Sequence, residues 1–479
     1  MDAIETQVSK INSNILINTF ATKNPDARQF RTSLWNLRQI FRSKGISKGS
    51  EDSMIKTTLS FGILKLISEQ QLLNRTLPTT IFMWGDWREG QLDREINNTI
   101  NDLLNQKNYS HLKDSLLIDK RLDNQACKKV INEFNKYSLY GSDFDFFGLI
   151  YESLANKDIK KDFGEFYTPR HIIRTMVKLL LNNETSPRPL SICDPACGTG
   201  GFLVESFLYL QRRYEMTNAL SNETRIQLKN NIFHGYDTNG KVAIPFARTN
   251  MLMADDGGIN IQVTEDSLIH LEEDKYDYVL TNVPYGSYTG EANIDNFSLT
   301  NSRRLELLFI EKIVKSLKRG GSGAVIVPDG LIESTSYSTY RKKLLRLIEL
   351  YAVISLPPFM FEPYTTEKTY ILFFKKNMPN QTGKFQKSPV WHFIIDNDGF
   401  KKGKKRYPIN ENDLPLLEES FLTGSQEGKY GFINFSDIND KTFYSFCSEY
   451  YMRLKKPIEI SIEQFQKIVE ELEGKTNYE

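Results

Sequence analysis

The sequence of 479 residues has few cysteines, no excess of either charge and no long apolar run. The four cysteines form no C-x-x-C pair, so we expect a reducing compartment and no metal site. Lys and Arg number 61 against 60 Asp and Glu, so a positive surface for nucleic acid must be local or come from another subunit. No segment approaches membrane-spanning length, and residues 1–5 lack a basic-then-apolar signal. We therefore expect a cytoplasmic protein without membrane contact.

The length favours two or three domains, since one ordinary core rarely holds so long a chain. Phe30, Leu34 and Leu37 recur at helical spacing, and this pattern predicts helices through most of residues 1–140. Arg31 and Arg38 make this region locally basic. A solvated helix face and a contact with DNA or a partner protein both remain open. No internal repeat or long low-complexity linker is present.

The stretch 190–202 is the strongest signal in the chain. A short apolar run ends at Asp194, turns through closely spaced glycines and continues from Phe202 with helical periodicity. This pattern predicts a strand, a turn that brings backbone close to a ligand, and a helix whose N-terminus points at that ligand. The stretch resembles the S-adenosylmethionine loop of amino-group DNA methyltransferases. The resemblance implies cofactor contacts from Asp194, Ala196, Gly198, Thr199, Gly200, Gly201 and Phe202, although a purely structural role for Asp194 in the turn stays open.

A second element precedes the loop by about thirty residues. We predict Thr168 as the N-cap of a helix and Pro169 in its first turn. The run also resembles the Glu-Phe-Tyr-Thr-Pro element of type I modification subunits, which closes over the methionine end of the cofactor. The resemblance implies that the cofactor site includes Glu165, Phe166, Tyr167, Thr168 and Pro169.

Strands and helices alternate beyond the loop, which predicts an α/β fold with a doubly wound parallel sheet. The last two strands lack a helix between them, so one should run antiparallel. Seven strands with this reversal resemble the Rossmann-like methyltransferase sheet, in which ligands bind at the carboxyl ends of the first strands. There we expect Asp237 to bind the ribose hydroxyls and Asp266 to bind the adenine amino group of the cofactor. The structural alternatives are a loop aspartate for Asp237 and a helix N-cap for Asp266. The predicted strands are 191–194, 232–237, 259–264, 276–281, 324–327, 351–356 and 369–374.

The catalytic candidates are Asn282, Val283, Pro284 and Tyr285, at the end of the fourth strand. They resemble the family pattern Asn/Asp-Pro-Pro-Tyr/Phe, with Val283 in place of the usual proline. The Asn282 side-chain oxygen and the Val283 carbonyl would each accept a hydrogen of the target amine. That interaction would localise the nitrogen lone pair toward the methyl group. Tyr285 would stack on a flipped base, and Phe361, with Phe359 close behind, is the candidate for the other face; core packing remains the alternative for both.

The C-terminal quarter gives weaker signals. Residues 390–400 read as a hairpin, and the basic run 401–406 that follows is either a solvated loop or an edge that contacts phosphate. Residues 460–472 predict an amphipathic helix that docks on a partner or packs on its own domain.

Over residues 141–415 the chain resembles the modification subunit of type I restriction–modification systems, a family of N6-adenine DNA methyltransferases. The resemblance implies S-adenosylmethionine as cofactor and double-stranded DNA, a specificity subunit and a second modification subunit as partners; whether a restriction subunit joins them stays open. With the helical patterns at both ends of the chain, we expect a helical domain at 1–140, a catalytic domain at 141–440 and a helical tail at 441–479. Alternatives are an amino methyltransferase for RNA or a protein glutamine, and a silent cofactor-binding scaffold.

Overall fold

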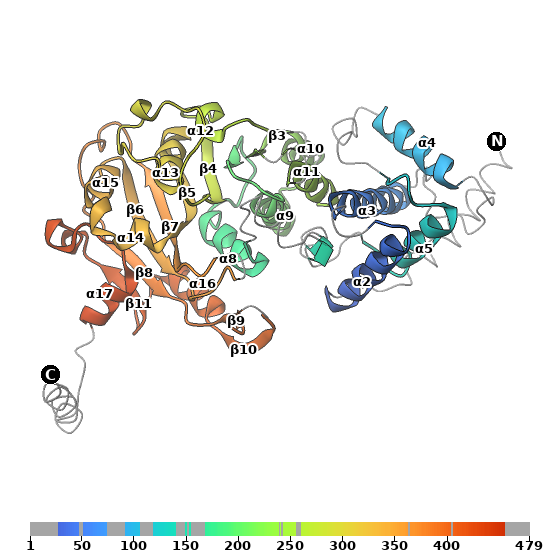
Figure 1. Cartoon of the computed structure of the whole chain (residues 1–479). Helices are drawn as coiled ribbons and strands as arrows, with labels where there is room; N and C mark the ends of the chain where they lie inside the picture. The colour runs from blue at the N-terminus through green and yellow to red at the C-terminus, as the bar shows by residue number, and fades with distance from the viewer. Residues whose placement is uncertain are drawn as a thin grey trace, which may run out of the picture.

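The chain folds around a central sheet with helices on both faces, and a further group of helices lies beside α11 (Figure 1). Among the residues described, no helix is both long enough and apolar enough to cross a membrane. The computed structural model describes residues 27–46, 51–73, 92–105, 118–139, 149–150, 153–154, 168–238, 240, 243–254, 260–362, 365–403 and 406–455.

The N-terminal helices share one apolar core. Phe30, Leu34 and Leu37 are buried in it, which confirms the helical pattern predicted there. The core also includes Phe246 and Leu252 of α11, so these helices pack against the sheet-containing part of the chain. The boundaries at residues 140 and 440 stay predictions. The N-terminal helices are α2 (Ala27–Ser43), α3 (Glu51–Leu73), α4 (Leu92–Leu104) and α5 (Asn124–Phe134).

Within the described part of the chain, the central sheet has nine strands in the order β11-β8-β6-β7-β5-β4-β1-β2-β3. Strands β3, β2, β1, β4 and β5 are parallel neighbours. Strand β7 runs antiparallel between β5 and β6, which confirms the reversal predicted from the missing helix between β6 and β7. Two strands extend the seven expected ones, β8 and β11. The sheet strands are β1 (Ile192–Asp194), β2 (Phe233–Asp237), β3 (Ile261–Val263), β4 (Tyr276–Asn282), β5 (Leu317–Pro328), β6 (Ile348–Ser355), β7 (Thr369–Lys376), β8 (Val390–Ile394) and β11 (Tyr430–Ile433).

Alternate residues of the strands face two separate apolar layers, as β geometry requires. In β5, Val325 and Val327 face one layer, whereas Ala324 and Ile326 face the other. The first layer is covered by α12 (Ser267–His270), α13 (Leu305–Ser316), α14 (Asp329–Glu333), α15 (Ser338–Leu344) and α17 (Ser448–Lys455). The second is covered by α8 (Arg170–Leu180), α9 (Gly201–Met216), α10 (Asn222–Asn231), α11 (Ala243–Met253) and α16 (Leu414–Thr423).

The predicted hairpin at 390–400 is wrong. Strand β8 is buried over Val390–Phe393 and joins the main sheet beside β6 and β11, because an apolar strand needs cover on both faces. The following strand, β9 (Asp398–Phe400), instead pairs with β10 (Pro408–Asn412) in a two-stranded sheet that carries the basic run in its connecting loop. The predicted helix at 460–472 lies outside the described residues.

Candidate functional site

The strand register brings the predicted site to one edge of the sheet. Asn282 ends β4, Asp194 ends β1 and Asp237 ends β2, and these three strands are parallel neighbours. A cavity of about 470 Å³ opens at this edge. It is lined by Pro195, Ala196, Gly198, Asp237, Thr238, Glu265, Asp266, Ser267, Asn282, Val283, Pro284, Ser287, Tyr288, Thr289, Gly290, Leu305 and Phe309. The cavity therefore joins part of the glycine loop to the predicted catalytic motif.

The glycine loop uses its glycines for two different reasons. Gly198 has φ +49°, the left-handed region that disfavours side chains, and an added Cβ would meet nothing within 4 Å. Its backbone therefore faces open space at the cavity. An added Cβ at Gly201 would lie 2.8 Å from Ile173 Cδ1, so this glycine lets α8 pack closely against α9.

Asp237 anchors the loop and also lines the cavity. Its Oδ2 accepts a hydrogen bond of 2.9 Å from the Gly198 amide. The carboxylate thus holds the turn that joins β1 to α9, and it remains at the position expected to bind ribose.

Asp194 is almost completely buried behind the loop. The Ala196 amide donates to its Oδ1 at 3.1 Å, whereas its Oδ2 has no hydrogen-bond partner among the described residues. Burial raises the pKa of Asp194 to about 7, against the lowering effects of the Thr281 hydroxyl and the Ala196 amide, and the Asp237 charge raises it further. The Thr281 hydroxyl and the Ala196 amide both face this carboxyl, which supports the turn from behind and does not itself line the cavity.

Of the residues expected from the loop, Ala196 and Gly198 line the cavity, and Asp194 and the remaining residues do not. Phe202 is buried among the side chains between α9 and the sheet, where the apolar periodicity of α9 places it. Its predicted cofactor contact is not supported. Thr199, Gly200 and Gly201 lie outside the cavity lining, although the Thr199 carbonyl accepts a 2.7 Å hydrogen bond from the Asn250 side chain.

Asn282 is held by two hydrogen bonds. Its Nδ2 donates to the Thr168 hydroxyl at 3.2 Å, and its Oδ1 accepts from the Tyr285 hydroxyl at 2.8 Å. Since one bond uses the donor group and the other the acceptor, together they fix which way the side-chain amide points.

The N-cap predicted at Thr168 is wrong. The helix α8 begins at Arg170, Pro169 occupies the cap position, and no side chain of the described residues caps the helix. Thr168 is instead only 6% exposed, and its hydroxyl bonds to Asn282, so a tertiary partner has replaced the local one. Glu165, Phe166 and Tyr167 lie outside the described residues.

The two aromatic candidates for the second face of the base, Phe359 and Phe361, differ in how far their side chains are exposed. Phe361 is 1% exposed and packs in the core layer beneath α8, so its ring faces side chains and the predicted stacking role is not supported. Phe359 is 43% exposed, with a left-handed φ of +62°. The Tyr285 ring is half-buried, and burial raises the pKa of its hydroxyl well above the usual value.

Asp266 is the N-cap of α12. Its Oδ1 accepts from the Leu268 amide at 2.8 Å, and its Oδ2 accepts from the Tyr288 hydroxyl. The cap that stood as the structural alternative is therefore present, and the same carboxylate lines the cavity. Tyr288, Leu305 and Phe309 also line it, and no motif in the sequence marks them.

Sequence reasoning also missed a buried ionic cluster around Asp398. Its Oδ2 lies 2.7 Å from His171 Nε2 and contacts the Arg406 guanidinium. Although burial acts to raise it, the His171 hydrogen bond and the Arg406 charge hold the pKa of Asp398 below its usual value. Arg406 also donates to the Met360 carbonyl at 2.9 Å. This Asp398 cluster ties the β9–β10 loop to the first turn of α8, beside Thr168.

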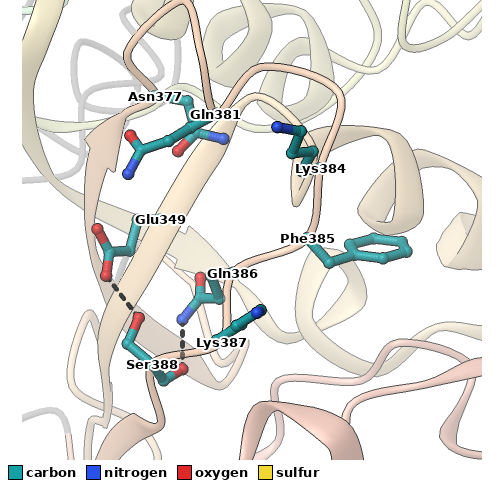
Figure 2. Close-up of a pocket in the computed structure, with 8 residues that line it drawn as sticks. All are labelled: Glu349, Asn377, Gln381, Lys384, Phe385, Gln386, Lys387 and Ser388. Atoms are coloured by element: carbon teal, nitrogen blue, oxygen red, sulfur yellow. Dashed lines mark hydrogen bonds between the residues drawn. The ribbon is translucent and has the colours of Figure 1, made fainter.

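A second hollow of about 290 Å³ lies at the opposite edge of the sheet, where β6 begins (Figure 2). Figure 2 shows two hydrogen bonds at Ser388: its hydroxyl donates to the Glu349 carboxylate, and its carbonyl accepts from the Gln386 side chain. The Gln386 side chain exchanges two hydrogen bonds with the Leu350 backbone, at 2.7 and 2.8 Å, in the manner of a strand neighbour. These side chains bond to neighbouring backbone and side-chain groups and so stabilise the local fold. The cavity at the carboxyl ends of the strands is therefore the candidate site.

Residues 142–456 match the model of the N-6 DNA methylase family, about two thirds of the chain. The chain is 32% identical over 315 residues to the type I restriction enzyme EcoEI methylase subunit of Escherichia coli, covering 63% of this chain and 58% of that protein. The EcoKI methylase subunit of E. coli K12 is 28% identical over 326 residues, covering 61% of this chain and 57% of that protein. The alignments thus span less than two thirds of these relatives.

Solved structures show the same fold. A modification subunit of a type I restriction enzyme from Vibrio vulnificus aligns with a TM-score of 0.64 at 21% identity, covering 87% of this chain and 94% of that one. A chain from a study of the assembly of a type I restriction–modification system aligns at 0.63 and 22% identity, covering 93% of this chain and 95% of that one. The sheet, the cavity and the sequence match agree: the chain belongs to the N-6 DNA methylase family.

Proposed function

We propose that the chain transfers a methyl group from S-adenosylmethionine to the N6 amine of a flipped adenine in double-stranded DNA. The supporting observation is that one cavity is lined both by the glycine loop at Gly198 and by Asn282 and Val283. A methyl donor at the first and an amine at the second would lie within the same cavity, and holding two reactants together contributes much of such a rate.

The residues present fit the cofactor in two respects. Gly198 faces open space, and Asp237 and Asp266 place carboxylates in the cavity lining. S-adenosylmethionine, when bound, supplies a methyl group on an electrophilic sulfonium. Asp194, Ala196, Gly198, Asp237 and Asp266 are the described residues that we assign to hold it, and Thr168 and Pro169 belong to the element assigned to its methionine end.

The target amine is assigned to Asn282 and Val283. The Asn282 Oδ1 already accepts from Tyr285, but a carbonyl oxygen has two lone pairs and can accept a second hydrogen. The Val283 side chain is buried and its amide bonds to the Ile326 carbonyl at 3.3 Å, so the backbone is fixed without the second proline of the family pattern. Tyr285 then has two roles, orienting Asn282 through its hydroxyl and offering its ring to the base.

We further propose that the chain is the modification subunit of a type I assembly. The relatives named as type I methylase subunits support this role. DNA sequence would be read by a separate specificity subunit, with a second copy of this chain in the complex.

The test is methyl transfer from radiolabelled cofactor to duplex DNA, RNA and protein, with and without a co-expressed specificity subunit. We expect label only in the adenine of duplex DNA, and only with the specificity subunit. Asn282→Ala should abolish it. The matched control is Asn380→Ala, at an exposed asparagine near the opposite sheet edge, which should leave transfer unchanged. Label in RNA or in a glutamine would contradict the proposal.

A further inference from the structure

Tyr288 lies in a segment that lines the cavity. This segment runs from Pro284, at the end of β4, to the start of α13. Backbone hydrogen bonds join its two ends. The Tyr288 amide donates to the Arg303 carbonyl at 2.6 Å, and the Leu305 amide donates to the Gly286 carbonyl at 2.8 Å. Tyr288 and Gly290 of this segment line the cavity.

The Tyr288 side chain is enclosed on several sides. Its hydroxyl donates to Asp266 Oδ2 and accepts a 2.6 Å hydrogen bond from the Ala292 amide. The Arg303 guanidinium lies 6.0 Å from the ring centroid, and a Cβ at Gly290 would approach the phenol oxygen to 2.5 Å. Only 6% of the residue is exposed. The phenol therefore has one position, and that position fixes Asp266.

Asp266 receives one hydrogen bond on each oxygen, from Leu268 on Oδ1 and from Tyr288 on Oδ2. Two donors on different atoms hold the plane of the carboxylate. Each oxygen keeps a second lone pair, because a carboxylate offers about four acceptor sites. An ionised carboxylate accepts hydrogen bonds and donates none, so it favours an amine and repels a carbonyl oxygen.

We propose that Tyr288 is a positioning residue that lets Asp266 select a purine carrying a 6-amino group, and so sets the preference for the adenine of the cofactor. The proposal rests on the cofactor site proposed above. With the phenol in place, the Asp266 carboxylate cannot rotate to avoid the carbonyl oxygen of a 6-oxo purine. Without it, Asp266 keeps only the Leu268 bond and can turn, so a 6-oxo purine is tolerated better.

The test compares S-adenosylhomocysteine with S-inosylhomocysteine, in which oxygen replaces the 6-amino group, by calorimetric binding to the full chain. We expect the wild type to prefer the amino compound by about 100-fold or more, since a site built for a donor rejects an analogue that lacks it. Tyr288→Phe should reduce that preference about tenfold, the equivalent of one hydrogen bond. Tyr450→Phe, at an exposed tyrosine of α17, should leave it unchanged.

Gly290→Ala is the second variant. Its methyl group displaces the phenol but keeps the Tyr288 hydroxyl, so it should reduce the preference as Tyr288→Phe does. The melting temperature of each ligand-free variant is measured alongside. A merely structural role for Tyr288 would lower the melting temperature and weaken both compounds equally.

The outcomes separate the two proposals. Equal weakening of both compounds, or an unchanged preference in Tyr288→Phe, overturns the role of Tyr288 while the cofactor site stands. A wild type that binds neither compound overturns the cofactor site, and the role of Tyr288 with it.

Discussion

The side-chain amide of Asn282 donates a hydrogen bond of 3.2 Å to the hydroxyl of Thr168, 114 positions earlier in the chain. Thr168 directly precedes Pro169, the residue at the cap of α8, and so this bond links the start of α8 to the end of β4. The arrangement of the candidate catalytic amide therefore depends on a helix that carries none of the predicted catalytic residues.

Thr168→Ala should slow methyl transfer at saturating cofactor. Removing the hydroxyl leaves the Asn282 amide held only by Tyr285, and one hydrogen bond of about 1 kcal/mol corresponds to roughly fivefold in rate. Single-turnover transfer on duplex DNA measures this change. Thr168→Ser, which keeps the hydroxyl, should restore most of the rate; a serine variant as slow as the alanine variant would contradict the role.

Asn282→Ala should lose methyl transfer and keep cofactor binding, whereas Gly198→Val should lose cofactor binding. The first removes the amine acceptor, so transfer is lost while binding of S-adenosylhomocysteine stays near the wild-type value. The second forces a branched side chain into left-handed backbone and into the open space at the cavity, so cofactor binding itself is lost. Calorimetry with S-adenosylhomocysteine separates the two. A large loss of affinity in Asn282→Ala would show that the residue holds the cofactor instead.

Asp194 should make the stability of the ligand-free protein depend on pH. Its pKa is raised to about 7 from the model-peptide value of 3.8, so the folded state binds the proton more tightly than the unfolded state. The contribution favours folding at low pH and is lost as the pH rises from about 4 to about 7. Asp194→Asn removes this titration. Relative to wild type, its free energy of unfolding should rise by about 1 kcal/mol per pH unit between pH 5 and 7 in urea titrations. A difference that stays constant with pH would contradict the raised pKa.

The Asp398 cluster should matter for stability far more than a surface ion pair does. Asp398→Asn removes the buried charge that faces both His171 and Arg406, and should cost about 2–4 kcal/mol of unfolding free energy. The matched control is Asp396→Asn, whose 60% exposed carboxylate pairs with Lys429 and whose loss should cost less than about 1 kcal/mol. Denaturant titration of both variants checks the contrast, and equal losses would contradict it.

Phe359 and Phe361 should give opposite phenotypes. Phe361→Ala empties a core position and should cost about 3–5 kcal/mol of stability. Phe359→Ala removes an exposed ring, so stability should change little while stacking of the flipped base weakens. Fluorescence of 2-aminopurine at the target position in duplex DNA measures flipping. If a fully folded Phe361→Ala variant lost base flipping and Phe359→Ala did not, Phe361 would be the stacking residue after all.

The parts that the sequence predicted well are those with local causes. A short apolar run that ends in an acid is enough to place Asp194 at the end of a strand, and closely spaced glycines are enough to place the turn after it. The same holds for Asn282, where the strand β4 meets Pro284. Because parallel strands align their carboxyl ends, these local predictions together place the cavity.

The parts that it missed depend on partners far away in the chain. Thr168 has the chemistry of an N-cap, and only the proximity of Asn282 gives its hydroxyl a different partner. His171 and Asp398 are 227 positions apart, and nothing near either residue announces the other. Likewise, the local sequence offers both Phe359 and Phe361 as exposed rings, and the packing beneath α8 decides which one is buried.

The most direct test of the account is the structure of the chain with S-adenosylhomocysteine and a duplex carrying the target adenine. The account predicts the cofactor product beside Gly198, Asp237 and Asp266, and the extruded base with its amine at the Asn282 side-chain oxygen. Cofactor density elsewhere on the molecule, or an Asn282 side chain that faces away from the base, would contradict it.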